Sequence, residues 1–332
     1  MYSDRKAIYS ELEKKRETKV LVYVTGDRPG FETKIASEVY DYFVNQLDSM
    51  NDHKKISLVL YTRGGDTLAA WSIINLIYQF TDDLEIIIPS KCHSAGTLMS
   101  LGAKRIVMTK QATLGPIDPS IEHPLNPLIP GAPNAAKIPV SVEAVEGYIQ
   151  FLKEELNFRQ KISGDEISRL LTQHIHPIVI GTVYRTKEQI KMLASRLLLN
   201  QIQDKKKTEK IISFLCSDSG SHDYTIHRRE ARDLLGLNIE KPDDELYSII
   251  KRIYDNIEKE LELTQKFDPN SFLGTAANKS YIFKRCLVET IEGGSYYFTT
   301  EGQMNRQQIQ TPQGIQNGIA DNRTFEGWKY EK

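Results

Sequence analysis

The first 115 residues alternate between two patterns of hydrophobic and polar positions. Short runs of β-branched and other apolar residues end in turn or polar residues, which is typical of strands in a parallel sheet covered on both faces. Between these runs, apolar residues recur every three or four positions, which predicts helices. The predicted strands span residues 19–26, 55–62, 84–90 and 105–109, and the predicted helices residues 32–50, 66–80 and 94–103. This alternation of strands and helices predicts βαβ units with right-handed crossovers, and therefore an α/β fold.

The next part of the chain changes pattern twice. Residues 115–139 contain seven of the thirteen prolines. That density excludes helices and central strands, and it predicts a long extended loop that serves either as a lid or as a passive surface. Residues 141–265 have mainly helical periodicity. We therefore expect a main domain over residues 1–265 whose second half is mainly helical.

Residues 266–332 follow as a C-terminal extension. Within them, residues 281–300 predict a β-hairpin that turns at Gly293 and Gly294. The end of the chain is polar and rich in Gln and Asn, so we expect a loosely held tail there.

Composition and charge narrow the functional classes. With 332 residues, 40% hydrophobic and 26% charged, the chain is typical of a globular protein. A formal net charge of −1 argues against broad electrostatic attraction to nucleic acid or to an anionic membrane. No apolar stretch approaches the roughly 18 residues of a membrane helix, and the charged N-terminus is unlike a signal peptide. We expect a cytoplasmic protein without stable membrane insertion.

No pattern for a metal or a cofactor stands out. The three cysteines, Cys92, Cys216 and Cys286, are far apart and form no C-x-x-C pair, which indicates a reducing compartment and neither disulfides nor a zinc site. His174 and His176 are a poor metal pair, because neighbours two apart on a helix do not converge. Neither G-x-x-x-x-G-K nor G-x-G-x-x-G is present, so we expect no metal, nucleotide or other cofactor.

Two junctions carry the candidate chemistry: "YTRGGDT" (61–67) and "PSKCHSAGT" (89–97), each joining the end of a strand to the start of a helix. Both open on the carboxyl edge of the sheet, where ligands bind in open α/β folds. Gly64 and Gly65 have no Cβ, so their N–H groups can approach a ligand, and helix N-termini add further donors. A hydroxyl at Ser94 that faces these donors would supply what acyl transfer needs, a nucleophile and an oxyanion site.

Ser94 also has a purely structural interpretation. Serine is favoured at the N-cap of a helix, and strand–loop–helix junctions commonly carry Gly and Ser. The spacing of the two junctions does not decide between a cap and a nucleophile.

At these junctions the sequence resembles the Clp-protease-like serine peptidases, in particular the signal peptide peptidase A branch and the serine dehydrogenase proteinases. The resemblance is carried by "TRGGD" (62–66) and "HSAGTLMSLGAKRIVMTKQATLGPIDP" (93–119). Two later elements, "IHPIVIG" (175–181) and "SHDYTIHRREARDLLGL" (221–237), are similar to the serine dehydrogenase proteinase group. The resemblance covers roughly residues 1–265 and implies a Clp-protease/crotonase-type fold.

The resemblance also implies roles for individual residues. Ser94 takes the position of the nucleophile, the N–H groups of Gly65 and Ala95 that of the oxyanion hole, and Gly64 shapes the turn. The implied function is a serine peptidase that cleaves a peptide or protein substrate through an acyl-enzyme. Members of the superfamily often assemble into rings, so we expect a homo-oligomer, and the apolar helix at 66–80, with Trp71, serves as core or as interface.

The general base stays open. In Clp protease a histidine follows the serine, but the matching "LGPIDP" has none, whereas in signal peptide peptidase A a lysine follows later, and Lys137 falls in that window. A desolvated lysine can act as a base, although a solvated loop lysine is the simpler interpretation. The ordinary pKa of histidine suits a general base near neutral pH better than that of lysine, which favours His176 and His222. Each of these can also be a structural histidine. Asp118 can orient a base or form an Asx-turn. His93 is expected to line the wall of the site.

Two other functions fit the same residues. A crotonase-type acyl-CoA enzyme uses the same oxyanion donors without a nucleophilic serine. A catalytically inactive scaffold that binds peptides or partners is favoured by the missing histidine after "LGP". An α/β-hydrolase esterase is disfavoured, because its G-x-S-x-G elbow needs a small residue where Cys92 stands. The lysine-rich "DKKKTEK" (204–210) is most simply a solvated helix surface.

Overall fold

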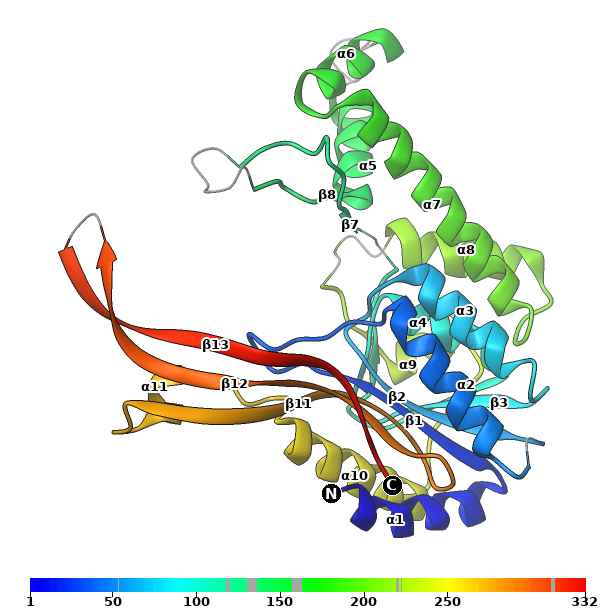
Figure 1. The fold of residues 1–332 in the computed structure, drawn as a ribbon. Coiled ribbons are helices and arrows are strands. Elements are labelled where there is room, and N and C mark those ends of the chain that lie inside the picture. The colour runs from blue at the N-terminus through cyan, green and yellow to red at the C-terminus, as the bar shows by residue number, and fades with distance from the viewer. Residues whose placement is uncertain are drawn as a thin grey trace.

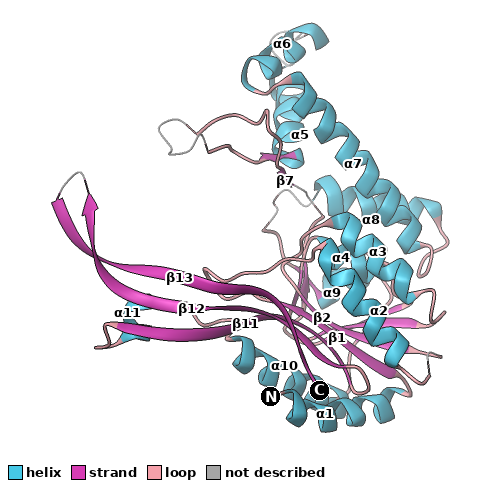
Figure 2. Ribbon diagram, in the orientation of Figure 1, coloured by secondary structure: helices cyan, strands magenta, loops and turns pink. Residues whose placement is uncertain are grey.

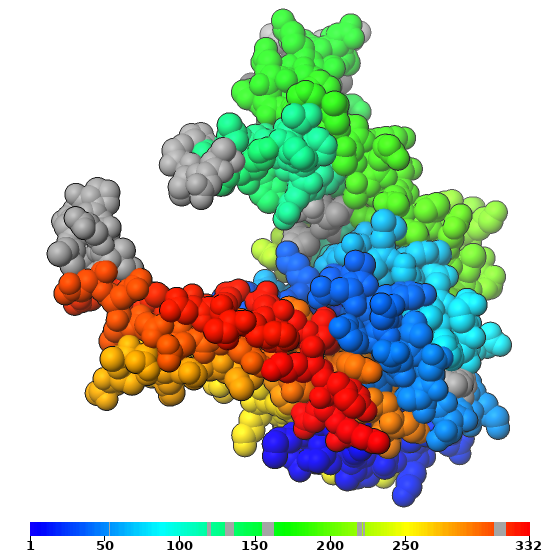
Figure 3. All heavy atoms as spheres, in the orientation of Figure 1, coloured from blue at the N-terminus to red at the C-terminus, as the bar shows by residue number. Residues whose placement is uncertain are grey.

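The computed structural model describes residues 1–52, 54–117, 120–129, 136–156, 163–218, 221, 223–311 and 314–332. In this part of the chain, the main sheet has eight strands in the order β10-β5-β3-β2-β1-β11-β12-β13. Helices cover both faces of its parallel half (Figure 1, Figure 2). A helical arm and a β-ribbon project from this body (Figure 3). The predicted α/β fold is confirmed.

The parallel half of the sheet consists of β1 (Lys19–Thr25), β2 (Ile56–Tyr61), β3 (Leu84–Ile88), β5 (Arg105–Met108) and β10 (Ile239–Glu240). The first four are the strands predicted from the apolar runs. Along β1, Val20, Val22 and Val24 pack into one core, whereas Leu21 and Tyr23 pack into the other. A strand covered on both faces needs apolar residues at every position, and this requirement produces the continuous runs.

Helices form a layer on each face of this half. One layer contains α2 (Tyr40–Ser49), α3 (Thr67–Ile77) and α4 (Ala95–Leu101), and the other contains α1 (Tyr2–Arg16) and α10 (Asp244–Leu261) (Figure 1). The predicted helix at 32–50 is wrong in its first part, because helical backbone begins only at η1 (Ser37–Val39). Ile35 instead bridges to Gly65, so tertiary pairing overrides local helical periodicity.

The C-terminal extension continues the same sheet. After α11 (Pro269–Leu273), the antiparallel strands β11 (Asn278–Thr290), β12 (Gly294–Thr311) and β13 (Gly314–Glu331) follow, and β11 pairs with β1. The expected loose tail is wrong, because β13 pairs with β12 from Glu331, opposite Ser295, to Gly314, opposite Thr311. Much of this ribbon projects from the body and is polar, so its strands leave no hydrophobic alternation in the sequence (Figure 1).

Besides the main sheet, the chain forms two small sheets and the helical arm between β3 and α10. One small sheet joins β4 (Lys91–Cys92), β6 (Thr113–Leu114) and β9 (Ile226–His227), and the other pairs β7 (Ser120–Ile121) with β8 (Val140–Ser141). The helices are α5 (Val142–Phe151), η3 (Leu152–Leu156), α6 (Gly164–His174), α7 (Pro177–Leu198), α8 (Lys205–Ser213), η4 (Phe214–Asp218) and α9 (Arg228–Asp233). The arm has its own small core around Val145, Leu171 and Val179. Within the described ranges, no helix has both the length and the apolarity to cross a membrane.

A buried carboxylate on β3 ties α1 to the sheet. The side chain of Glu85 is fully buried, where an unpaired charge would be costly. Arg16 of α1 donates to it at 2.6 Å, Arg105 donates at 3.1 Å, Ser57 donates through its hydroxyl, and the Lys55 ammonium lies 3.3 Å away. Burial alone raises the pKa of Glu85, but the bonds from Arg16 and Ser57 outweigh burial and lower this pKa to about 2.

This lowered pKa predicts a loss of stability in acid. Folding lowers the pKa of Glu85 from its ordinary 4.5 to about 2, so the charged carboxylate contributes about 3 kcal/mol to the free energy of unfolding. That contribution is complete above pH 4.5 and is lost as the pH falls through about 2. In urea unfolding between these pH values, Glu85→Gln should show a flatter pH dependence than the wild-type protein. Equal slopes for the two proteins would contradict this assignment.

Candidate active site

The first junction is a tight turn that only glycine can form. It follows β2, and Gly64 and Gly65 have φ of 109° and 148°. The N–H of Ile35 donates to the Gly64 carbonyl at 2.9 Å, and the N–H of Asp66 donates to the Ile35 carbonyl at 2.8 Å. A Cβ on Gly65 would lie 2.3 Å from the Ile35 carbonyl oxygen. The sequence "GG" is therefore required by close backbone approach as well as by positive φ.

The pairing with Ile35 also sets the direction of the Gly65 amide. Successive N–H groups of an extended backbone point to opposite sides. The Asp66 N–H and the Gly64 carbonyl face Ile35, so the Gly65 N–H faces away from it. Among the described residues, this N–H has no acceptor, whereas the Gly64 N–H donates to Thr62 Oγ1 at 3.0 Å. The turn thus presents one unused donor.

Ser94 occupies the N-cap position of α4 but does not act as a cap. Its side chain accepts no hydrogen bond from the first turn of the helix. Its backbone has φ of 51° and ψ of −114°, a conformation that non-glycine residues rarely adopt and that costs about 1–3 kcal/mol. Capping therefore explains neither the hydroxyl nor the strained backbone.

The two junctions touch each other. A Cβ on Gly64 would lie 2.7 Å from Ser94 Cβ and 3.2 Å from Ser94 Oγ. Ala95 is the first residue of α4, so its N–H has no acceptor within the helix and adds to the positive potential of the helix start. The structure thus brings together Gly64, Gly65, Ser94 and Ala95, although they come from separate strand–helix junctions.

The segment after β5 fixes the start of α4 from the other side. Thr97 Oγ1 donates to the carbonyl of Cys92 at 3.0 Å or of Gly115 at 2.7 Å, and it accepts from the Gly115 N–H at 3.1 Å. Gly115 begins the "GPIDP" element, of which Asp118 lies outside the described residues. This element therefore helps to hold the Ser94 junction in place.

A pocket of about 510 Å³ opens over Ser94. The residues that line it come from six separate segments of the chain: Asp27, Pro29, Arg63, Lys91, His93, Ser94, Pro116, Asp223, Leu263 and Thr264. Most of these side chains are polar or charged. Ser94, which is partly buried, thus lines a pocket whose walls are mostly polar.

A buried carboxylate organises the cations of this pocket. Asp27 accepts from the Lys91 ammonium at 2.6 Å and from the Tyr61 hydroxyl at 2.7 Å, and Arg63 lies 3.4 Å away. Burial, together with the charge of Asp27, raises the pKa of Tyr61 well above its usual range. Asp27 thereby places two positive side chains beside Ser94. Sequence analysis missed Asp27 and Lys91, because only their position at strand ends, in "TGD" and "PSK", hints at a role.

His93 lines the wall of the pocket. Its Nε2 is hydrogen-bonded with Thr113 Oγ1 at 2.9 Å. Its ring packs beside Gly115, since a Cβ there would lie 3.1 Å from His93 Cγ. The His93 imidazole therefore lies against "LGP" (114–116), the segment in which the resemblance to Clp protease leads one to look for a histidine and finds none.

The other predicted site residues are not brought to Ser94 in the described part of the chain. Lys137 is exposed, and its ammonium donates to the carbonyl of Pro124. His176 is exposed at the N-cap of α7, where its Nδ1 accepts from the Ile178 N–H at 3.2 Å. His222 lies outside the described residues, although the next residue, Asp223, lines the Ser94 pocket.

Comparison with known proteins agrees with the resemblance read from the sequence. Residues 1–132 match the family described as ClpP-like SDH-type serine proteinase. Two relatives are uncharacterized proteins of Methanocaldococcus jannaschii. MJ0137 is 27% identical over 200 residues, which cover 60% of this chain and 58% of the relative. MJ1495 is 26% identical over 233 residues, which cover 68% of each chain. The match thus spans less than two thirds of MJ0137.

Two solved structures share 16% sequence identity with the chain. A mutant of the 1510-N membrane-bound stomatin-specific protease in complex with a substrate peptide has a TM-score of 0.37, covering 68% of this chain and 78% of that one. ClpP1 from Listeria monocytogenes has a TM-score of 0.36, covering 71% of this chain and 99% of that one. The predicted family resemblance is confirmed over residues 1–132, which carry both junctions of the site and match the ClpP-like SDH-type serine proteinase family.

Proposed function

We propose that the protein is a serine peptidase in which Ser94 is the nucleophile. One observation carries the proposal: the uncapped hydroxyl of Ser94 lies against Gly64, in a strained backbone conformation, beside the Gly65 and Ala95 amides, for which the described residues supply no acceptor. Strain of this kind is retained where the surrounding structure enforces it, and it is common at active sites. A serine that only capped α4 would need neither the strained backbone nor the neighbouring amides.

The chemistry follows from this arrangement. Ser94 Oγ attacks the carbonyl carbon of a peptide bond, and the N–H groups of Gly65 and Ala95 donate to the oxyanion that forms. A nitrogen base takes the serine proton and returns it to the leaving amine. Water then attacks the acyl-enzyme, and the same base takes a proton from the water, so that Ser94 is restored.

The strained serine also separates this function from the rival ones. A crotonase-type enzyme needs the two donors but no nucleophile, so nothing in its mechanism requires positive φ at Ser94. A scaffold that binds peptides needs neither the strain nor the unused Gly65 donor. The pocket over Ser94 is lined largely by polar and charged side chains, which suits a peptide backbone better than an acyl chain.

Substitution of Ser94 tests the nucleophile directly. We expect a fluorophosphonate probe to label the wild-type protein and to leave Ser94→Ala and Ser94→Gly unlabelled. Ser94→Gly should also be more stable than the wild type by about 1 kcal/mol, because glycine adopts φ of 51° without strain. Ser72→Ala, at a partly buried serine of α3, is the matched control and should keep its labelling. Labelling of Ser94→Ala at the wild-type rate would rule the nucleophile out.

Substitution of Gly65 tests the oxyanion donor. In Gly65→Ala the new Cβ meets the Ile35 backbone at 2.3 Å, so the turn must shift and carry its N–H away from the pocket. Loss of one such donor lowers the rate by about 10²–10³. Gly181→Ala, where a Cβ meets nothing within 4 Å, controls for the substitution itself. Labelling rates measured by stopped time points should fall for Gly65→Ala alone, and equal rates would contradict the assignment.

The base is tested by alanine substitution at each nitrogen candidate. Lys91 and His93 line the pocket, and His222 precedes a pocket residue, so we expect a loss of about 10²–10⁴ in labelling rate at one of these three. Lys137→Ala and His176→Ala should retain the wild-type rate. The pH profile adds a second readout, because an imidazole gives a midpoint near 6.5 and an amine a much higher one. A requirement for Lys137 or His176 would place the base in a neighbouring subunit.

A further inference from the structure

Arg63 is a cation at the Ser94 pocket that the chemistry proposed above does not use. It directly precedes Gly64 and Gly65, and it lines the pocket. Its side chain is 55% exposed, and its guanidinium donates no hydrogen bond to the described part of the chain. A guanidinium carries five N–H donors in a fixed fork that fits a carboxylate. The donors of Arg63 are therefore available to a ligand.

The Arg63 side chain is not needed to hold the turn that it borders. That turn is fixed by backbone hydrogen bonds, from the Ile35 N–H to the Gly64 carbonyl and from the Asp66 N–H to the Ile35 carbonyl. Neither bond involves a side chain. The fold of the turn thus explains the two glycines and leaves the arginine before them without a structural role.

The charges around Asp27 do not balance. The buried carboxylate of Asp27 accepts from the Lys91 ammonium at 2.6 Å, whereas Arg63 Nη1 lies 3.4 Å away. Two cations beside one carboxylate leave one positive charge in surplus. Since Lys91 makes the short contact, the surplus lies on Arg63. Glu32, itself 40% exposed, is 4.0 Å from Arg63, and an exposed ion pair of that length contributes little.

The remaining acidic residue of the pocket lining is Asp223. It comes from the segment before β9, and it forms no ion pair with Arg63 or Lys91. The charge of Arg63 is therefore not neutralised from that wall of the pocket. A surplus cation with unused donors at the rim of a pocket favours an anionic ligand group.

We propose that Arg63 selects peptides that carry a carboxylate close to the scissile bond. This inference rests on the peptidase function proposed above and names its substrate class. Gly64 lies against Ser94, so the backbone of Arg63 is one residue from that contact. A residue of extended peptide spans about 3.3–3.6 Å, so the selected carboxylate lies within a few residues of the bond. It comes either from an Asp or Glu side chain or from the free C-terminus of the substrate.

Peptide binding to the full-length Ser94→Ala chain tests the selection without catalysis. Short alanine-based peptides with an uncharged dansyl group at the N-terminus are compared in three forms. The first has Glu at each inner position in turn and an amidated C-terminus, the second has Gln instead, and the third has Gln and a free C-terminal carboxylate. Fluorescence anisotropy should show about tenfold tighter binding of the first or the third form than of the second, because a charge-assisted hydrogen bond is gained. Preference for the first form identifies a side-chain carboxylate, and preference for the third a terminal one.

Substitution of Arg63 in the same chain identifies the residue responsible. Arg63→Gln should bind the acidic and neutral peptides equally. Arg63→Lys keeps the charge but loses the fork, so it should keep part of the preference. Arg185→Gln, at an exposed arginine of α7 outside the pocket, is the matched control and should keep all of it. The ratio between two peptides cancels any general loss of affinity, and circular dichroism confirms that each variant is folded.

The outcomes separate this proposal from the catalytic one. Equal binding of all three forms, no detectable binding of any, or a preference that survives in Arg63→Gln would each overturn carboxylate selection, even where a fluorophosphonate labels Ser94. Conversely, a preference that depends on Arg63 in a protein without such labelling would support the carboxylate site and refute the nucleophile. Where Ser94 is active, the ratio of kcat/KM for acidic and neutral peptides should follow the ratio of their affinities.

Discussion

The backbone pairing between Ile35 and the turn at residues 64–66 is the constraint on which the site depends. Ile35 uses the Gly64 carbonyl and the Asp66 N–H, and this leaves the amide of Gly65 facing the other way. The pairing is possible because β1 and β2 are parallel neighbours, so the segments that follow them run side by side. The amide that we propose as an oxyanion donor therefore takes its direction from strand order, and it is held by the sheet rather than by a flexible loop.

The strain at Ser94 can persist only because α4 cannot move away. Every residue of α4 is buried. A Cβ on Gly96 would lie 2.4 Å from Thr62 Cγ2, so the helix start is packed directly onto the end of β2. Thr97 Oγ1 donates to the carbonyl of Cys92 or of Gly115 and accepts from the Gly115 N–H. The close packing around α4 thus offsets the free energy of the strained backbone at Ser94. In this way a core residue such as Thr97 supports a site that it does not touch.

The sequence predicted those parts of the fold that burial controls. Strands covered on both faces require continuous apolar runs, so β1, β2, β3 and β5 were visible, whereas the solvated ribbon of β12 and β13 left no such signal. In the candidate site, Gly64, Gly65 and Ser94 could be singled out because each lies in a short strand–helix junction whose residue types alone indicate an unusual backbone conformation. Asp27 could not, since its role depends on Lys91, which is distant in the chain and adjacent only after β1, β2 and β4 have assembled.

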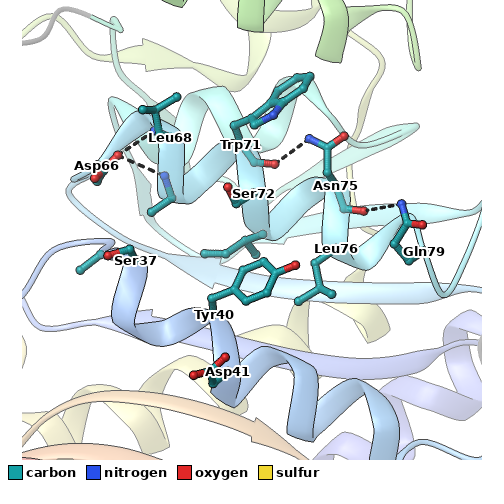
Figure 4. Close-up of a pocket in the computed structure, with 13 residues that line it drawn as sticks. Ser37, Tyr40, Asp41, Asp66, Leu68, Trp71, Ser72, Asn75, Leu76 and Gln79 are labelled. Carbon is teal, nitrogen blue, oxygen red and sulfur yellow. Dashed lines mark hydrogen bonds between the residues drawn. The ribbon is translucent and has the colours of Figure 1, made fainter.

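The turn at 64–66 serves two surfaces at once. Its Gly65 amide faces away from Ile35, while the next residue, Asp66, caps α3 and lines a groove between α2 and α3 (Figure 4). Substitution of Asp66 removes the cap of α3 directly after the turn, so its effect on the groove could not be separated from its effect on the donor proposed at Gly65. Asp41 lies on α2 and shares no hydrogen bond with the turn. It is therefore the carboxylate through which the groove can be probed without disturbing the turn at 64–66.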